Sequence, residues 1–255
     1  MKDNMDTKLT EKCFKGMAGA YAAMFTPYDA KGRVNPEMIA RIIDYGIRNG
    51  MNGFYLTGST GEWWLLSVEE RKQVMDAAVK AAKGRCKLIA HVGANCTDDS
   101  VELAKYAAKV GIDWISSLTP MLYRTSFEAT CYHYRTITAA TDLPFMVYAL
   151  SGALVPDRDI RLFDIPHVKG IKYTGRDYYS AQCLKRRLDH RRSGSRAATS
   201  SSCAGLRSAT CSPAASAPRT TSSRSTSRRS RSSPRRASSA RRRSGRTRRT
   251  RWSSS

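Results

Sequence analysis

Six short apolar segments alternate with amphipathic helical patterns along the first 190 residues of this 255-residue chain. Their nearly continuous apolar character is typical of a parallel sheet that is covered on both faces. Repeated strand–helix units imply right-handed crossovers, so the pattern predicts an α/β fold. The expected strands are Ala18–Phe25, Gly53–Leu56, Lys87–Val92, Trp114–Leu118, Phe145–Leu150 and Val168–Tyr173.

The helices between these segments have clear start and stop signals. Asn35 followed by Pro36 predicts an N-cap with proline at the first helical position, and Gly50 predicts the end of that helix. The same logic predicts three further helices: one with a capping box at Ser67–Glu70 and a stop at Gly84, one from Thr97-Asp98 to Gly111, and one that opens at Thr125–Glu128.

Two arrangements of these units compete. An open, doubly wound sheet is possible, but the first strand–helix turn lacks the GxGxxG phosphate loop. A barrel explains better why polar residues follow several different strands, because the carboxyl ends of barrel strands converge on one active-site face. These residues are Thr26, Ser59, Thr60, Thr119, Tyr148, Lys172, Tyr173 and Thr174. We therefore predict a (β/α)₈ TIM barrel that is incomplete, with six units where a closed barrel needs eight.

The composition changes abruptly near residue 190. Residues 191–255 hold 18 Arg and 21 Ser but no Lys, Asp or Glu, whereas residues 1–190 hold 26 Lys and Arg against 21 Asp and Glu. The formal net charge of +23 therefore describes the tail. Such a segment cannot bury enough surface to offset backbone ordering. We predict a partial barrel domain at 1–190 and a disordered, low-complexity basic tail at 191–255.

Three interpretations of the tail remain open: an arm that binds RNA or membrane, a flexible linker, or out-of-frame translation. The third explains most, because arginine without lysine, together with Ser, Ala, Thr, Pro, Gly and Cys, is typical of a shifted frame in GC-rich DNA. The change also falls inside a predicted helix, 181–188. In each case the arginines would bind polyanions without specificity and in a salt-dependent way.

Cysteine usage and the N-terminus predict a cytoplasmic location. The seven cysteines form no CxxC motif and no zinc-like spacing to histidine, which favours a reducing compartment. The N-terminus lacks the apolar core of a signal peptide, and no apolar run is long enough to span a membrane. We interpret His91, His133 and His167 as structural, and no metal site is visible in the sequence.

Lys172 lies within the apolar segment Val168–Thr174 and is the first candidate catalytic residue. Buried lysines are rare, and burial lowers the pKa of the amine, which leaves it able to attack a carbonyl. The alternative is a lysine at the surface or in an ion pair.

Two further elements could act with this amine. The loop Gly58–Glu62, sequence GSTGE, follows a strand, and its successive amides could hold a carboxylate, although a plain turn is the alternative. Tyr148 and Tyr123 each end or follow a strand, and each could equally be a core tyrosine whose hydroxyl meets the backbone.

Taken together, these motifs resemble the Schiff-base class I aldolases of the N-acetylneuraminate lyase and dihydrodipicolinate synthase superfamily. The resemblance covers about residues 16–190 and is strongest to N-acetylneuraminate lyase, because Tyr148 is not followed by the arginine of the synthases. It depends on four segments: GSTGE at 58–62, TPMLYRTSFEATCYHYR at 119–135, VY at 147–148 and GIKYT at 170–174.

The resemblance implies roles for individual residues. Lys172 would form an imine with the keto carbon of pyruvate or sialic acid, and Ser59 and Thr60 would bind the pyruvate carboxylate. Tyr148 would move the proton of the sugar hydroxyl during C–C cleavage, tuned by its position relative to Thr60 and Tyr123. Thr174 would contact the substrate.

The resemblance also implies a lyase that releases pyruvate and an aldehyde sugar, and intact relatives that are homotetramers with neither a metal nor an organic cofactor. The family usually has Asn-Ile-Pro after the tyrosine, then a few residues and then a glycine. Here only three residues separate Tyr148 from Gly152, as if this segment were shortened. Strands seven and eight have no counterpart, so two sheet edges would be exposed, and we expect an insoluble or inactive product.

Other functions remain as alternatives. They are a dihydrodipicolinate synthase-like enzyme, a 2-keto-3-deoxy sugar acid aldolase, and an RNA-binding protein that uses the Arg/Ser tail.

Overall fold

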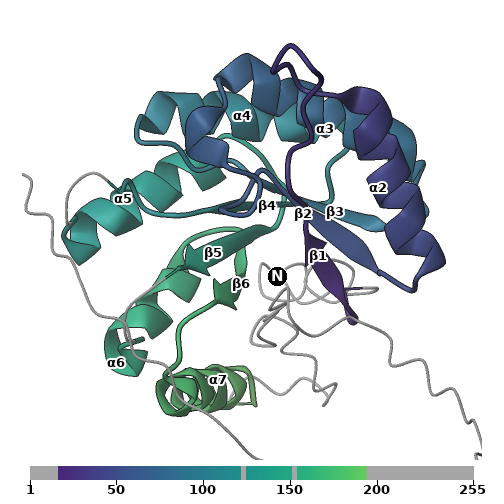
Figure 1. Cartoon of the computed structure of the whole chain (residues 1–255). Coiled ribbons are helices and arrows are strands. Elements are labelled where there is room, and N and C mark those ends of the chain that lie inside the picture. The colour runs from purple at the N-terminus through teal and green to yellow at the C-terminus, as the bar shows by residue number, and fades with distance from the viewer. Residues whose placement is uncertain (1–16, 122–124, 151–153, 194–255) are drawn as a thin grey trace, which may run out of the picture. The chain divides into compact units, whose positions relative to one another are not determined.

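Six parallel strands form one curved sheet in the order β1-β2-β3-β4-β5-β6 (Figure 1). The computed structural model describes residues 17–121, 125–150 and 154–193, all of which belong to one compact unit. The strands are β1 (Tyr21–Ala23), β2 (Gly53–Leu56), β3 (Lys87–His91), β4 (Trp114–Ser117), β5 (Phe145–Ala149) and β6 (Val168–Tyr173).

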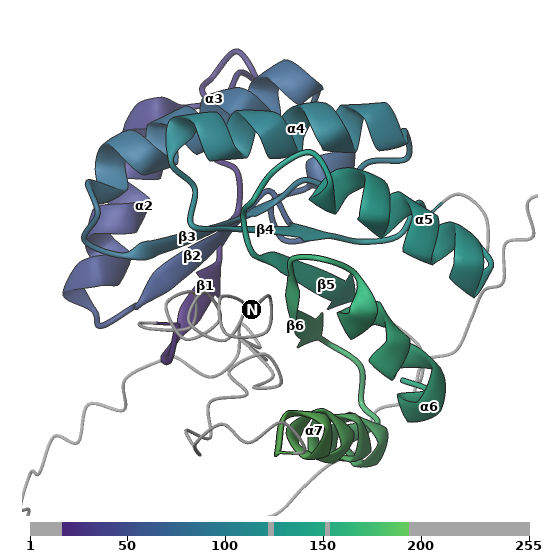
Figure 2. The same ribbon diagram turned by 180° about the vertical axis from the view of Figure 1, so that it is seen from behind.

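Helices follow the strands and lie outside the curve of the sheet, as the view from behind also shows (Figure 2). They are α2 (Pro36–Arg48), the 3₁₀ turn η1 (Trp63–Leu65), α3 (Val68–Ala82), α4 (Thr97–Val110), α5 (Phe127–Thr138), α6 (Pro156–Asp159), the 3₁₀ turn η2 (Ile160–Asp164) and α7 (Tyr178–Ser193). This arrangement confirms the predicted fold class, a partial TIM barrel. The domain boundary at residue 190 and the disorder of the tail stay predictions, because residues 194–255 lie outside the described residues.

The predicted helix starts are confirmed, with one shift. The Asn35 side chain accepts a hydrogen bond from Met38 N at 3.0 Å, with proline at the first helical position. Ser67 and Glu70 form the predicted capping box. The cap of α5 is Ser126, whose Oγ accepts from Ala129 N at 3.1 Å, and not Thr125.

Two other details differ from the expectation. Strand β1 is limited to Tyr21–Ala23, shorter than the apolar run 18–25. The short helices over 156–164 were not predicted, because their sequence is too short to show a helical period. Proline at the start of α6 is the only local signal in the described part of that segment.

The sheet separates two apolar clusters. One lies between the sheet and the helices and includes Phe54, Leu88, Ile115 and Ile171. The other faces the inside of the curve and is rich in aromatic rings, with Tyr55, Trp63, Ile89, Trp114, Leu118 and Tyr148. Because side chains alternate along a strand, residues two apart from these inner positions also face inward. The inner face is where the candidate catalytic residues lie.

Candidate active site

Lys172 and Tyr148 are register partners on adjacent strands, β6 and β5. Lys172 Nζ lies 3.9 Å from the ring centroid of Tyr148 and 3.5 Å from that of Tyr55 on β2. The two rings meet edge to face, with centroids 5.8 Å apart. The amine therefore lies between two aromatic side chains on the inner face of the sheet, and Lys172 is half-buried there, whereas the sequence predicted an enclosed lysine and did not predict these neighbours.

Burial lowers the pKa of Lys172 from 10.5 to about 7. Among the described residues, no carboxylate forms an ion pair with Lys172, so no negative charge opposes this effect. The aromatic faces favour the ammonium form to some extent, but desolvation is the larger effect. The lowered pKa leaves a fraction of the amine neutral and nucleophilic near neutral pH.

The hydroxyl of Tyr148 reaches the GSTGE loop. Ser59 Oγ lies 3.2 Å from Tyr148 Oη, and either oxygen can donate the hydrogen bond. Tyr148 is buried, whereas Ser59 is half-buried and Thr60 is exposed. The structure thus brings Lys172, Tyr148 and Ser59 together, with Thr60 next to them in the loop.

The loop is held by its backbone and by close packing. Gly61 N and Trp63 N both donate to Gly58 O, at 3.0 and 3.4 Å, and the Thr26 hydroxyl donates to Gly61 O at 2.8 Å. A Cβ on Gly58 would lie 2.5 Å from the Tyr55 ring, which explains the glycine. The N–H groups of Ser59 and Thr60 donate to no described residue. Free amides in such a turn are suited to an anion.

The remaining predicted residues are less closely tied to the amine. Thr174 donates to Leu150 O at 2.7 Å, so its hydroxyl joins the ends of β5 and β6. Tyr123 lies outside the described residues, and its role stays a prediction. Glu62 is exposed, and its side chain makes no capping hydrogen bond at the start of η1.

Sequence reasoning did not identify two residues of this site. Tyr55 encloses the amine and donates to Ser116 Oγ at 2.9 Å on the inner face. Arg71 on α3 is buried and donates to the carbonyls of His91 and Gly93 at the end of β3. The sequence signal for Tyr55 was its place in β2, three residues before Gly58, where alternation directs it inward.

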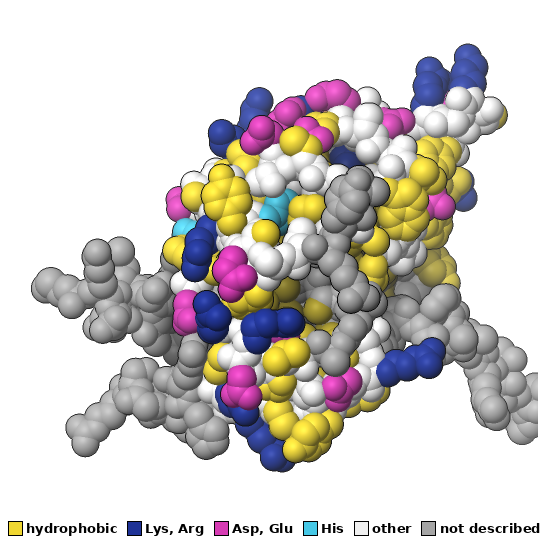
Figure 3. All heavy atoms as spheres, turned by 90° about the vertical axis from the view of Figure 1, so that its left-hand side faces the viewer, with side chains coloured by type: hydrophobic (Ala, Val, Ile, Leu, Met, Phe, Trp, Pro, Cys, Tyr) yellow, Lys and Arg dark blue, Asp and Glu magenta, His cyan; other side chains and the backbone are white. Residues whose placement is uncertain are grey.

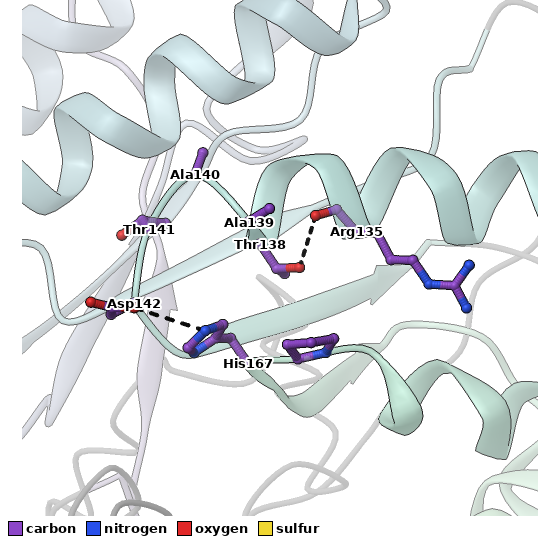
Figure 4. A pocket seen from close by; sticks show the side chains of 8 residues that line it. Arg135, Thr138, Ala139, Ala140, Thr141, Asp142 and His167 are labelled. Carbon is purple, nitrogen blue, oxygen red and sulfur yellow. Dashed lines mark hydrogen bonds and ion pairs between the residues drawn. The ribbon is translucent and has the colours of Figure 1, made fainter.

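A hollow of about 510 Å³ lies elsewhere, on the loops before β5 and β6 (Figure 4). Its lining includes Arg135, Thr141, Asp142 and His167. Figure 4 shows the Arg135 side chain pointing away from the other labelled residues, and His167 and Asp142 are 3.9 Å apart. These side chains do not converge on one point, so the hollow does not present a set of groups that could bind or activate a substrate.

Two features of the described residues bear on other functions. No group of three or more His, Cys, Asp or Glu side chains could hold a metal ion. None of the helices in the described ranges combines the length and the apolar character needed to cross a bilayer. On the side of the unit drawn in Figure 3, basic and acidic side chains of the described residues are interspersed, without a patch of one sign.

The chain is similar to several known proteins. Over 175 residues the chain is 39% identical to the N-acetylneuraminate lyase of Escherichia fergusonii. The aligned region covers 67% of this chain and 59% of that protein. The crystal structure of N-acetylneuraminate lyase from Mycoplasma synoviae matches with a TM-score of 0.66 and 33% identity, covering 69% of this chain and 61% of that one.

A dihydrodipicolinate synthase from Acinetobacter baumannii, crystallised with pyruvate, matches with a TM-score of 0.63 and 30% identity, covering 68% of this chain and 61% of that one. The chain thus spans about three fifths of the length of these relatives. Residues 16–193 match the model of the dihydrodipicolinate synthetase family, and the chain therefore belongs to that family.

Proposed function

We propose that this chain carries the active site of a Schiff-base lyase that cleaves N-acetylneuraminate, or a related 2-keto sugar acid, to pyruvate and an aldehyde sugar. The observation that carries the proposal is the enclosure of Lys172 Nζ by the Tyr55 and Tyr148 rings, with its pKa near 7. An amine that is partly neutral at physiological pH can attack a ketone without a separate base. The identity to N-acetylneuraminate lyases supports the choice of substrate.

The first steps fix the substrate. The carboxylate would lie against the free amides and hydroxyls of Ser59 and Thr60, next to the amine. Lys172 Nζ attacks the C2 ketone, and the resulting carbinolamine loses water to give a protonated imine. This imine is the electron sink for the next step, because its positive nitrogen accepts the electron pair of a breaking bond.

Cleavage then requires one proton acceptor. The proton of the C4 hydroxyl passes to Tyr148 Oη while the phenolic proton passes to Ser59 Oγ and the Ser59 proton to the bound carboxylate; the reverse path later delivers this proton to C3. The C3–C4 bond breaks, its electron pair moves into the imine to form an enamine, and the aldehyde leaves. Protonation of the enamine at C3 and addition of water release pyruvate and restore the free lysine.

A trapping experiment tests the proposal. Soluble, folded protein is incubated with pyruvate and reduced with borohydride, which converts the imine into a stable amine that mass spectrometry locates. We expect the adduct on Lys172, its loss in Lys172→Ala, and its retention in the matched control Lys169→Ala on the same strand. A folded protein without an adduct would overturn the proposal. An adduct would contradict the expectation that the chain is insoluble or inactive.

The same assay with substrates separates the alternatives. Release of pyruvate from N-acetylneuraminate, compared with release from a 2-keto-3-deoxy sugar acid, identifies the preferred class. RNA binding through the tail predicts salt-sensitive binding that is lost on deletion of residues 191–255 and is unaffected by Lys172→Ala.

A further inference from the structure

His91 ends β3 on the inner face of the sheet and is completely buried. Its ring lies beside the site, with its centroid 6.1 Å from that of Tyr148 in an edge-on arrangement and 5.4 Å from that of Trp63. The mechanism above gives this imidazole no role. A buried imidazole this close to a nucleophile must nevertheless satisfy both of its nitrogens.

The two ring nitrogens connect the ends of two other strands. Leu118 N, after β4, donates to Nε2 at 3.2 Å, and Nδ1 lies 3.1 Å from Thr57 O, after β2. Because an amide N–H can only donate, Nε2 must be the acceptor and the ring proton must be on Nδ1. The hydrogen bonds therefore select one tautomer, in which Nδ1–H donates to the Thr57 carbonyl.

The charge state of the ring agrees with this assignment. Burial, followed by the positive charges of Arg71 and Lys172, holds the pKa of His91 well below its ordinary value of 6.5. The imidazole is neutral at physiological pH, so Nε2 keeps the lone pair that the Leu118 amide needs.

Thr57 has an unfavourable backbone conformation. Its φ is 46°, in the left-handed region that a β-branched residue rarely adopts. Such a conformation persists only where neighbouring groups hold it. Here Thr57 and His91 are joined twice, since Thr57 Oγ1 also donates to His91 O at 3.0 Å. Arg71 donates to the same carbonyl from α3 at 2.5 Å.

Thr57 is the residue at which the chain leaves β2 and enters the Gly58–Thr60 turn. Its left-handed φ sets the direction of that turn, and with it the free amides and the Ser59 hydroxyl that faces Tyr148. We propose that His91, through its Nδ1–H, is a positioning residue that holds Thr57 in this conformation and thereby orients the turn that binds the keto-acid carboxylate. The effect of this positioning on catalysis rests on the proposed function.

Two substitutions at the same position separate the two hydrogen bonds. In His91→Asn the short amide places an N–H near the position of Nδ1 and can still donate to Thr57 O. In His91→Gln the longer amide places an oxygen near the position of Nε2, which keeps the Leu118 bond and removes the donor to Thr57. Both variants lose ring packing, so a merely structural role predicts similar effects in both.

The readout is the concentration of pyruvate that half-saturates borohydride trapping. We expect it to rise about tenfold in His91→Gln, as for the loss of one hydrogen bond of about 1.4 kcal/mol, and by at most about threefold in His91→Asn. Adding Thr57→Gly to His91→Gln should restore most of the loss, because glycine adopts a positive φ without strain. Equal values for the two His91 variants, or no rescue by glycine, would overturn the proposal.

A structural readout keeps this test separate from the proposed function. Should the wild-type protein form no pyruvate adduct, the lyase proposal fails, while crystals of His91→Gln still decide the positioning role. A change of φ at Thr57 to a negative value supports it, and an unchanged positive φ overturns it.

Discussion

Replacement of Lys172 by methionine should stabilise the folded protein at neutral and acidic pH, with a gain that fades as the pH rises. The pKa of Lys172 falls from 10.5 in the unfolded chain to about 7 in the fold. Below pH 7 the lysine is protonated in both states, and the folded state bears the full cost of a desolvated ammonium. Between pH 7 and 10.5 the unfolded chain binds one more proton, so stability rises with pH.

The size of the effect follows from the same two values. At about 1.4 kcal/mol per pH unit, the drop from 10.5 to about 7 corresponds to at most about 5 kcal/mol. Methionine has a similar length and no charge, so Lys172→Met should recover much of this amount at pH 6. By pH 10 most of the difference should have disappeared, because this pH is close to the pKa of the lysine in the unfolded chain, where deprotonation costs little.

Urea unfolding at pH 6, 7, 8, 9 and 10 measures this difference, since buried Trp63 and Trp114 report unfolding by fluorescence. Lys105→Met, at an exposed position of α4, is the matched control and should change stability by less than about 0.5 kcal/mol at each pH. A difference between wild type and Lys172→Met that is the same at pH 6 and pH 10 would refute the lowered pKa, and with it the neutral nucleophile.

Four other substitutions test parts of the site and fold. Tyr148→Phe keeps the ring over the amine, so pyruvate trapping should persist while cleavage of the sugar acid falls by about 10²- to 10⁴-fold in an assay of pyruvate release. Tyr55→Phe removes the hydrogen bond to Ser116 and should cost about 1 kcal/mol in urea unfolding; no loss would show that the bond contributes nothing. Gly58→Ala should abolish trapping, because the added Cβ meets the Tyr55 ring at 2.5 Å, and normal trapping would contradict the packing. Ser67→Ala should cost about 1 kcal/mol through the lost cap and leave trapping unchanged, as unfolding and trapping on one sample will show.

Much of the fold follows from local sequence signals. The strands lie close to the predicted segments because apolar runs bounded by caps and glycines are local features. Asn35 and Ser67 mark helix starts because their side chains accept hydrogen bonds from backbone N–H groups. Gly111 marks a helix end because glycine adopts the left-handed backbone conformation there. The shift of the α5 cap from Thr125 to Ser126 shows how closely a helix start can be predicted, since two adjacent hydroxyl residues give almost the same capping signal.

The site is less predictable because it depends on distances across the sheet. Strand alternation indicates that Lys172 and Tyr148 can face inward, but not that the ring centroid of Tyr55 lies 3.5 Å from Lys172 Nζ. That contact depends on the curvature of the sheet, which brings β2 near β6 although β3, β4 and β5 separate them in the hydrogen-bonded order. The role of His91 was missed for the same reason: its partners, Thr57 and Leu118, belong to the strands on either side.

The curvature also explains why the amine can be desolvated on an edge strand. In the described sheet β6 has one hydrogen-bonded neighbour, β5, so strand pairing alone would leave one side of Lys172 open. The Tyr55 ring encloses the amine from across the curve, and Tyr148 encloses it from the adjacent strand. Lowering the pKa of Lys172 is therefore a property of the inner aromatic cluster, and substitutions in that cluster should change the chemistry of the amine before they change the pairing of β6.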